Sequence, residues 1–388
     1  MNQIVSKLKQ KGFRWFVWRL GRELRTPTNP LFKLVIDKLL YLKKTISNNV
    51  DSADKDEFLY VICDLDINAI TFNMTERLVD AEYESNKRGK TGFVLVFVPR
   101  SNDTRLSNKE YDAVIDDASK HWKFQNVVLP VTMLSRKCKG VYILPKRSDA
   151  ITFVKGREIY PELYDGVNLR ATGVGDLFRK LDRPNLVEGL RAPKQGLRYV
   201  KSWVLENGIK DPIVTITIRD YMYDKARNSN IEACSQFANY LNSRSYHPVI
   251  IPDTDNAFCE NHQFDGLTVF KECAWNIDLR ASLYESAFLN FFPPTGPSQL
   301  AVYNPQCSYI QMNSLPKGSI VTTKEAYKLS NHPIWSDYKF ATRNQRLCFK
   351  PDTFENLVSE FERFEKDQNF QTINEEPVRS TNTGITLN

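Results

Sequence analysis

Short apolar runs that alternate with helical segments constrain the fold of this chain more than any other feature. Residues 58–63 and 93–98 are uninterrupted apolar runs, and runs of this length are typical of strands that are buried on both faces. Between them, Asn73 followed three residues later by Glu76 matches a helix-start signal, so a helix is expected from there to about residue 87. Strands and helices that alternate in this way predict a parallel sheet covered by helices.

The alternation continues through the first half of the chain and begins again in the second. In the first half, a helix is expected over residues 107–120 and strands over residues 126–129 and 141–144. A helix over about 194–206 leads to a second series of strands, expected at 213–218, 248–252, 267–270, 288–292 and 308–312. Apolar residues spaced three and four apart behind Asp352 predict a terminal helix. These elements predict an α/β protein with two Rossmann-like domains.

The charge of the chain is concentrated at its beginning. Residues 1–44 hold eleven Lys and Arg against two acidic residues, a balance of +9, whereas the whole chain balances at +7. Basic amphipathic helices are expected in residues 1–46, the second with apolar residues at 31, 34, 35, 39 and 42. We expect residues 1–44 to bind an anionic membrane surface, to which each basic residue contributes about 1 kcal/mol. A helix packed on its own protein is the alternative, and nucleic acid ranks last because the rest of the chain has no basic groove.

The cysteines and histidines give no sign of a disulfide framework or a metal centre. The seven cysteines are scattered without a C-x-x-C pair, and the four histidines include no H-x-x-x-H pair. An odd number of scattered thiols suits a reducing cytoplasm, and no apolar run reaches the roughly 18 residues that a membrane span needs. The chain is therefore expected to be cytoplasmic, with no cofactor and no metal ion.

Ligands of open α/β sheets bind beyond the carboxyl ends of the strands, so the loops that follow the predicted strands are the candidate sites. The loop after residue 218 carries two arginines and an Asn-Ser-Asn run at a helix start, which suits an anion clamp. Its candidate donor-binding residues are Arg219, Arg227, Asn228 and Asn230. In the alternative interpretation the arginines pair with Asp220 and Asp224, and Asn230 only caps the helix.

Three further loops carry candidate residues. Asp253 and Asp255 are expected to hold ribose or sugar hydroxyls, unless they form an ordinary turn. The segment after residue 292 offers hydroxyls, a close approach to the backbone and a helix start for a diphosphate, unless it is a tight connection; its candidates are Thr295, Gly296, Pro297 and Ser298. Asp64 and Asp66 follow the first strand and are the candidate general base, with turn and cap formation as the alternative.

The second half resembles the donor-binding domain of GT-B-type glycosyltransferases. The resemblance rests on residues 216–219 with 227–230, on 253–255, and on 283–285 through 295–297. In that superfamily, an Arg-bearing loop after the first strand of the second domain holds the donor phosphates, and a later Gly-containing turn completes the donor pocket. A C-terminal helix in such enzymes crosses back toward the first domain.

The resemblance implies a domain order and a function. Two Rossmann-like domains would face a cleft, with the acceptor domain over residues 57–192 and the nucleotide-sugar domain over 193–350. A helix over 351–366 and a disordered tail over 367–388 would follow. The implied activity is metal-independent transfer of a sugar from a nucleotide-diphosphate donor to a glycan or lipid-linked acceptor of the cell surface, at the cytoplasmic face of the membrane. A GT-B-like sugar-nucleotide 2-epimerase and a non-catalytic carbohydrate-binding relative are the alternatives.

Overall fold

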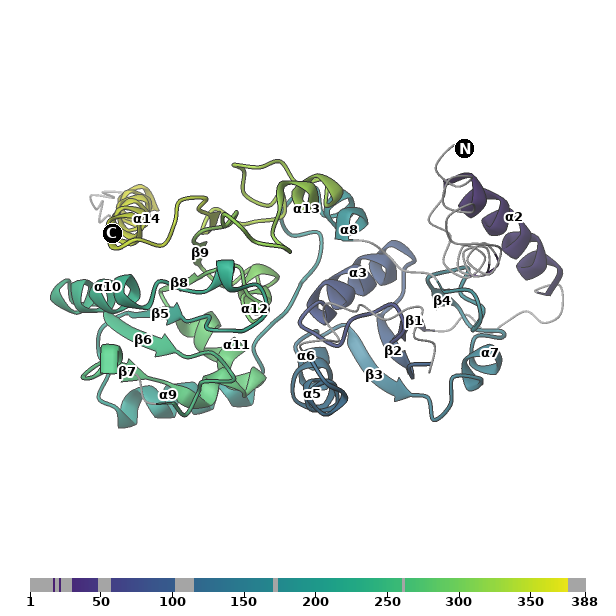
Figure 1. The fold of residues 1–388 in the computed structure, drawn as a ribbon, viewed down its shortest axis with the longest axis horizontal. Helices are drawn as coiled ribbons and strands as arrows, with labels where there is room; N and C mark the ends of the chain where they lie inside the picture. The colour runs from purple at the N-terminus through teal and green to yellow at the C-terminus, as the bar shows by residue number, and fades with distance from the viewer. Residues whose placement is uncertain are drawn as a thin grey trace, which may run out of the picture.

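Two parallel sheets lie side by side in the protein (Figure 1). The computed structural model describes residues 17, 21, 30–47, 57–101, 115–169, 174–259 and 262–375 of the chain. The strand order is β3-β2-β1-β4 in the first sheet and β10-β9-β8-β5-β6-β7 in the second. Neighbouring strands pair in parallel in both sheets, as the alternation of strands and helices predicts.

The first domain is built on four strands, β1 (Phe58–Asp64), β2 (Gly92–Val98), β3 (Cys138–Ile143) and β4 (Ile159–Tyr160). Its described residues form the helices α3 (Met74–Lys87), α5 (Asp117–Lys123), α6 (Leu129–Thr132), α7 (Asp149–Phe153) and α8 (Val174–Lys180). Every residue of β2 is buried, which explains why this strand is apolar at each position rather than at alternate positions.

The strand expected over residues 126–129 is wrong. A π-helix over Phe124–Val128 continues from α5 into α6, and the side chain of Asn126 donates to the carbonyl of Trp122 one turn before it. Val127 and Val128 of this helix are buried. A short apolar run fits a buried helix as well as a buried strand. Part of the helix expected over 107–120 lies outside the described residues, and α5 begins at Asp117.

The second domain contains six strands, β5 (Ile213–Thr217), β6 (His247–Ile251), β7 (Thr268–Val269), β8 (Leu289–Phe292), β9 (Tyr309–Gln311) and β10 (Gln345–Leu347). Its helices include α9 (Lys194–Glu206), α10 (Ile231–Ser243), α11 (Ile277–Ser286), α12 (Gln299–Val302) and α13 (Lys324–Leu329). Strand β10 was not expected, because its residues Gln-Arg-Leu form no apolar run and the strand lies at the edge of the sheet.

The terminal helix α14 (Phe354–Glu375) stays on the second domain. Its Phe361 and Phe364 are buried in one apolar cluster with Phe237 of α10, and Figure 1 shows α14 beside α10, far from the first domain. The expected return of this helix to the first domain is therefore wrong, since its apolar stripe is already covered. The helix also continues beyond residue 366, into the expected disordered tail; residues 376–388 lie outside the described part.

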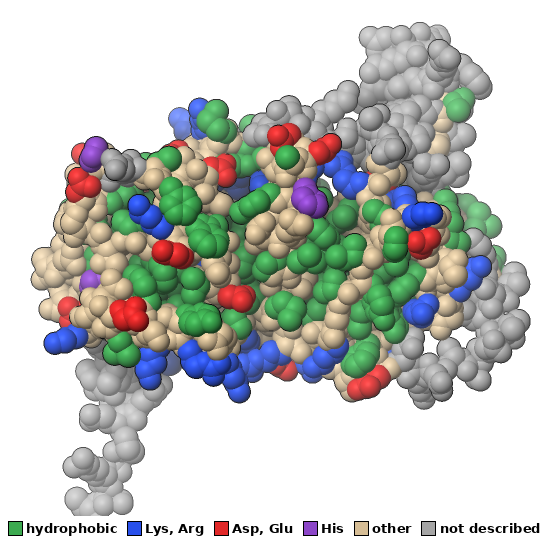
Figure 2. Space-filling view, turned by 90° about the horizontal axis from the view of Figure 1, so that it is seen from below, with side chains coloured by type: hydrophobic (Ala, Val, Ile, Leu, Met, Phe, Trp, Pro, Cys, Tyr) green, Lys and Arg blue, Asp and Glu red, His purple; other side chains and the backbone are tan. Residues whose placement is uncertain are grey.

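The two domains meet through a shared core and a clamped linker. A single apolar cluster contains Leu78 of α3 together with Tyr284 and Tyr303 of the second domain. In the linker, the carboxylate of Glu82 accepts the backbone N–H groups of residues 188 and 189, and the next N–H, at Leu190, donates to the carbonyl of Tyr303 at 2.8 Å. Figure 2 shows hydrophobic side chains over the middle of the face seen from below, where the domains join. The junction therefore holds α3 against the second domain.

Helix α2 (Pro30–Ser47) lies on the far side of the first domain (Figure 1). Only one of its described apolar side chains, Ile36, is buried, whereas four are between 56% and 60% exposed: Leu34, Val35, Leu39 and Leu42. The rest of the expected basic arm lies outside the described residues, apart from residues 17 and 21. Within the described ranges, no helix has both the length and the apolar character to cross a membrane.

Candidate functional site

The three candidate loops of the second domain lie at one edge of its sheet. Strand β5 is paired with β8 on one side and with β6 on the other. Because parallel strands end at the same edge, the loops that follow β5, β6 and β8 are neighbours there. The loop after β5 is also bonded to the loop after β6, since the side-chain amide of Asn256 donates to the carboxylate of Asp220 at 2.8 Å.

Arg219 points into its own loop. It is 3% exposed, and its guanidinium donates to the carbonyls of Tyr223 and Asp224 and to the side-chain oxygen of Asn228. Burial, followed by the nearby charge of Arg227, lowers the pKa of Arg219 to about 10. The donors expected to hold a phosphate are therefore used to shape the loop, which favours the structural alternative for Arg219.

Arg227 pairs with an acidic neighbour, as the structural alternative requires. Its Nε lies 3.0 Å from the Asp224 carboxylate, and burial lowers the pKa of Arg227. Asp224 has a left-handed backbone (φ 56°) and also accepts from the hydroxyl of Ser319 at 2.6 Å and from the backbone N–H of Ile320 at 3.2 Å. Asp224 thus joins the loop after β5 to the segment that precedes α13.

The two asparagines of this loop are structural. Asn228 exchanges hydrogen bonds of 3.2 Å with the backbone N–H and carbonyl of Tyr221. Asn230 caps α10 by accepting the N–H of Ala233 at 3.2 Å, while its own N–H donates to Asp352 at 2.8 Å. Asn230 thereby satisfies one of the free N–H groups in the first turn of α10.

The acidic loop after β6 faces a lysine of the first domain. Asp253 accepts backbone N–H groups from Asp220 and Asp255, and burial raises the pKa of Asp253. Burial lowers the pKa of Lys123 on α5, and the charges of Asp255 and Asp253 oppose that effect. The Lys123 ammonium also donates to the Tyr221 hydroxyl at 3.2 Å. Asp255 is exposed, so its carboxylate remains the accessible acidic group of this loop.

The turn after β8 lies against the first domain. A Cβ added to Gly296 would lie 2.7 Å from Cδ2 of Phe72, so the close approach here comes from a phenyl ring. Ser298 is buried, and its hydroxyl donates to the carbonyl of Thr295 at 2.6 Å; Pro297, between them, is half-buried. Helix α12 has only four residues, so the expected diphosphate site at its start has few aligned peptide dipoles behind it.

Asp64 and Asp66 form an ion-pair cluster with Arg147. Asp64 is 1% exposed and accepts from Arg147 at 2.5 and 2.9 Å and from the Tyr164 hydroxyl at 2.7 Å. Asp66 lies 3.0 Å from Arg147 and accepts the N–H of Ser101. Burial opposes the charge of Arg147, but Asp64 and Asp66 together raise its pKa. These contacts occupy the oxygens that a general base needs. Asp64 also accepts the backbone N–H of Asp66 at 3.0 Å, so a structural role is favoured over the expected catalytic role.

Glu76 is a candidate that the sequence did not single out. The helix-start signal assigned it to a cap, but Asn73 makes no side-chain cap hydrogen bond. Within the described part of the chain, the half-buried Glu76 carboxylate has neither a hydrogen bond nor an ion pair. Burial raises the pKa of Glu76 to about 7, against the opposing charge of Arg77. The sequence signal for this residue was an acidic side chain in the first turn of the helix that follows β1. The capping motif explained the same residue equally well.

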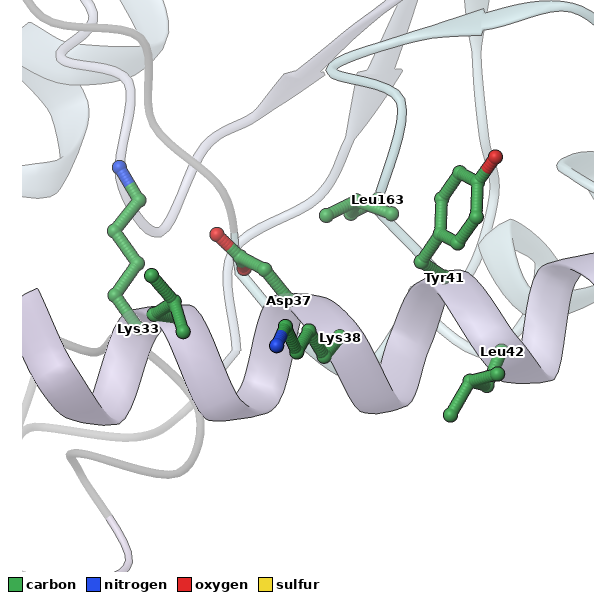
Figure 3. Close-up of a pocket in the computed structure, with 7 residues that line it drawn as sticks. Lys33, Asp37, Lys38, Tyr41, Leu42 and Leu163 are labelled. Atoms are coloured by element: carbon green, nitrogen blue, oxygen red, sulfur yellow. The ribbon is translucent and has the colours of Figure 1, made fainter.

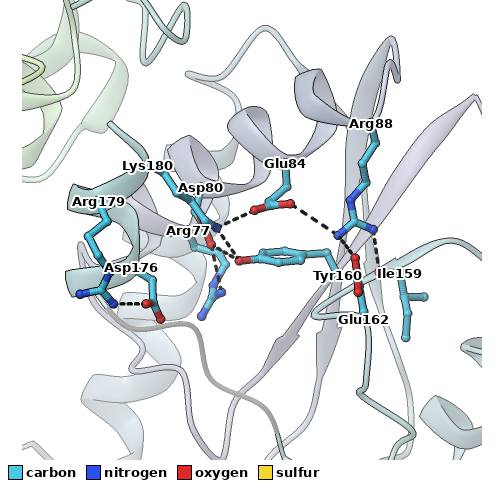
Figure 4. A network of polar contacts seen from close by, with 10 residues as sticks. All are labelled: Arg77, Asp80, Glu84, Arg88, Ile159, Tyr160, Glu162, Asp176, Arg179 and Lys180. Atoms are coloured by element: carbon cyan, nitrogen blue, oxygen red, sulfur yellow. Dashed lines mark hydrogen bonds and ion pairs between the residues drawn. The ribbon is translucent and has the colours of Figure 1, made fainter. Parts of the chain in front are cut away.

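Three other charged groups of α3, Arg77, Asp80 and Glu84, belong to a polar network in which Glu76 takes no part (Figure 4). Asp80, one turn after Glu76, lies 2.6 Å from the ammonium of Lys180 and 3.8 Å from Arg77. Glu84 lies 2.7 Å from the same ammonium. Arg77 and Lys180 therefore already have carboxylate partners, and neither lies within ion-pair distance of Glu76.

The second domain presents aromatic side chains to Glu76. Burial raises the pKa of Tyr303, and the charge of Glu76 contributes next. Burial also raises the pKa of Tyr338, with Tyr327 and then Glu76 as the charged contributors. Phe72, one turn before Glu76, lies against Gly296 in the turn after β8. The unpaired carboxylate of Glu76 therefore lies at the junction of the two domains, beside the carboxyl edge of the second sheet.

No metal centre is evident within the ranges that the structure describes. Those residues include no group of three or more His, Cys, Asp and Glu side chains placed to hold a metal ion. The thiols are free, and burial raises the pKa of Cys63 to about 12 and of Cys138 to about 11. Neither thiol therefore has the thiolate character of a nucleophile or a metal ligand.

Comparison with known proteins gives a fold but no sequence relative. No protein-family model matches the chain, and no curated protein matches its sequence. The glycosyl transferase of family 9 from Veillonella parvula superposes with a TM-score of 0.50 at 7% identity, over 82% of this chain and 100% of that chain. The ADP-heptose heptosyltransferase II of E. coli has a TM-score of 0.46 at 8% identity, over 80% and 99%. The iron-containing heptosyltransferase TibC has a TM-score of 0.38 at 14% identity, over 80% of this chain and 76% of that chain.

At these identities the likeness concerns the fold alone. The Veillonella structure is matched over its whole length, so both domains of this chain have their counterpart in it. Together with the two parallel sheets, this confirms the fold expected from the sequence, two Rossmann-like domains of the GT-B type.

Proposed function

We propose that this protein is a glycosyltransferase that moves a sugar from a nucleotide-diphosphate donor to a hydroxyl group of a surface-glycan acceptor. The observation that carries the proposal is the placement of Glu76 of α3. It lies one turn from Phe72, which contacts Gly296 at the carboxyl edge of the second sheet. Ligands of α/β sheets bind at that edge. A carboxylate on the first domain, across the domain junction from the donor, is placed to accept a proton from an acceptor hydroxyl.

The chemistry assigned to Glu76 is general base catalysis. Its carboxylate takes the proton of the acceptor hydroxyl as that oxygen bonds to the anomeric carbon, and the bond from this carbon to the diphosphate breaks. A base with a pKa near the working pH is effective because it is largely deprotonated yet still basic, and burial raises the pKa of Glu76 to about 7. Asp255, which is exposed at the same edge, is the group proposed to accept hydrogen bonds from donor hydroxyls.

A donor screen with a base variant tests the proposal. Nucleotide sugars with UDP, GDP, ADP and CMP are screened for a rise in Tm, since a ligand of the folded state stabilises it. The stabilising donor is then incubated with glycan acceptors, and products are followed by mass spectrometry. Glu76→Gln is expected to bind the donor but lose about 10²- to 10⁴-fold in rate. Glu325→Gln, an exposed glutamate on α13, is the matched control.

The alternatives give different products. Interconversion of the nucleotide sugar without an acceptor would identify a 2-epimerase, and binding with no product would identify a carbohydrate-binding relative. We also propose that transfer needs no metal ion, so the rate is expected to be unchanged in EDTA. Loss of activity in EDTA that added Mg²⁺ or Mn²⁺ restores would contradict this part.

We further propose that the enzyme works on the inner face of the cell membrane, held there by its basic beginning. The support is the exposure of the apolar side chains of α2, since Leu34, Val35, Leu39 and Leu42 are each more than half exposed. Lys33, Asp37 and Tyr41 of the same helix line a pocket with Leu163 (Figure 3), and its volume is about 640 Å³. An amphipathic helix with exposed apolar residues and lysines suits an anionic lipid surface.

Flotation with vesicles tests the membrane proposal. The full chain is expected to float with vesicles that contain phosphatidylglycerol and to remain behind with neutral phosphatidylcholine vesicles. Leu39→Glu should release it, whereas Leu205→Glu, on the exposed surface of α9, should not. Flotation of Leu39→Glu at the wild-type level would contradict a role for α2.

A further inference from the structure

Arg280 is a buried cation without a counter-ion. It lies on α11 and is 2% exposed, and it is the largest of the fully buried side chains that the structure describes. Its Nη2 donates to the carbonyl of Pro252 at 3.3 Å, and its Nε has no hydrogen-bond partner among the described residues. A guanidinium has five N–H donors, so most of its capacity is unused by the described part of the protein.

The other buried arginines of the domains are satisfied. Arg77 donates to the side-chain oxygen of Asn68 at 2.5 Å, and Arg219 donates to three oxygens of its own loop. Arg280 forms no ion pair with any described carboxylate. The carboxylate of Asp253, on which the charge of Arg280 acts, is bonded to backbone N–H groups instead. An uncompensated buried charge of this kind destabilises the folded state.

The position of Arg280 connects it to the candidate site. Pro252 directly follows β6, so its carbonyl marks the carboxyl edge of the second sheet. The same loop carries the exposed Asp255. Because Arg280 is 2% exposed, binding of a ligand requires this loop to move aside. An anion at this edge would supply the missing counter-ion, and a phosphate matches the planar, bidentate geometry of a guanidinium.

We propose that Arg280 is a binding residue for a phosphate of the nucleotide-diphosphate group. This inference rests on the proposed function, since it names the residue that holds the donor's charge. Arg280 takes the phosphate-binding role that the sequence suggested for Arg219 and Arg227, because the N–H groups of those two arginines bind their own loop. The N–H groups of Arg280 that have no partner in the described part of the protein would donate to the phosphate when the ligand is bound.

Replacement of Arg280 by an apolar residue of similar length separates binding from stability. Arg280→Met is expected to bind pyrophosphate, ADP, GDP and UDP at least tenfold more weakly than the wild type in isothermal titration calorimetry. Its Tm without ligand should be equal to or higher than that of the wild type, because a buried unpaired charge is removed. Arg198→Met, on the exposed face of α9, should change neither quantity.

Unchanged affinity in Arg280→Met, or a wild type that binds none of these compounds, would overturn the inference. A Tm that falls by several degrees without ligand would do so too, because it would show that the charge is already satisfied. If Arg280→Met does not fold, Arg280→Lys carries the test, since lysine keeps the charge but loses the bidentate geometry. It is expected to bind pyrophosphate several-fold more weakly, and wild-type affinity would overturn the inference.

The two proposals can fail separately. Pyrophosphate binding that depends on Arg280, with no sugar transfer from any donor, would overturn the proposed function alone. Sugar transfer with equal kcat/KM in the wild type and Arg280→Met would overturn the inference alone.

Discussion

Phe72 and Gly296 belong to different domains, and the ring of Phe72 occupies the space that a side chain at position 296 would need. A Cβ on Gly296 would lie 2.7 Å from Cδ2 and 3.2 Å from Cγ of the ring. Contacts this short force something to move. Glycine at position 296 is thus required by the packing of one domain on the other, and the turn after β8 is held by the segment that leads into the helix of Glu76.

Gly296→Ala is expected to destabilise the protein by about 1–3 kcal/mol, the usual cost of overpacking a fitted contact. The added methyl group must displace the Phe72 ring or the turn itself. Urea unfolding measures the loss. Phe72→Ala also destabilises, by removing a partly buried ring, but Gly296→Ala in the Phe72→Ala background should cost much less than in the wild type. Additive effects of the two changes would contradict the contact.

Arg219→Ala is expected to lose stability as well as activity. The guanidinium donates to Tyr223, Asp224 and Asn228, so its removal leaves buried oxygens unsatisfied, at about 2–4 kcal/mol. The loop between β5 and α10 should become sensitive to limited proteolysis. A phosphate clamp would instead lose donor affinity at wild-type stability, and that result would restore the function first expected from the sequence.

The sequence predicts the buried strands well because burial on both faces leaves a continuous apolar run. Strands β1, β2, β5 and β8 were found in this way, and α9 was expected within its observed bounds. Residues 126–129 show the limit, because four apolar residues fit one buried helical turn as well as a strand. Strand β10 has no apolar run at all.

The loops of the site were predicted, but the roles of their side chains were not. Position in a parallel sheet follows from the order of elements, which placed the loops after β5, β6 and β8 at one edge. Whether Arg219 points outward or into its own loop depends on carbonyl positions that only the folded loop provides. Glu76 is the opposite case, since a capping motif explained it until the structure showed no cap bond at Asn73.

Asp64→Asn is expected to lower the free energy of unfolding by about 2–4 kcal/mol, because it breaks a buried ion pair while Asp66 remains beside Arg147. Tyr164→Phe, which removes one hydrogen bond to Asp64, should cost about 1 kcal/mol. Chemical denaturation checks both values. An Asp64→Asn protein of wild-type stability with no transferase activity would instead support the general base first expected at this position.

Glu76 is expected to make both activity and stability depend on pH around neutrality. Burial raises the pKa of Glu76 from 4.5 to about 7, so the folded state holds this proton more tightly than the unfolded state. The contribution of the group to the free energy of unfolding is therefore complete below about pH 4.5 and is lost as pH rises through 7. At pH 8 the charged carboxylate destabilises the fold by about 1–2 kcal/mol, since partial exposure reduces the full effect.

The variant Glu76→Gln separates the two consequences. Glutamine removes the charge, so the variant should be more stable than the wild type at pH 8 and about equally stable at pH 4.5, as urea unfolding at the two values would show. Activity moves the other way: wild-type kcat/KM should rise with pH through about 7 as the base loses its proton, whereas the variant should be slow and flat. A variant that is stabilised at pH 8 but keeps the wild-type pH profile would show that Glu76 is a buried carboxylate without a part in the reaction. Equal stability at both pH values would show that its proton is not held by the junction between the domains.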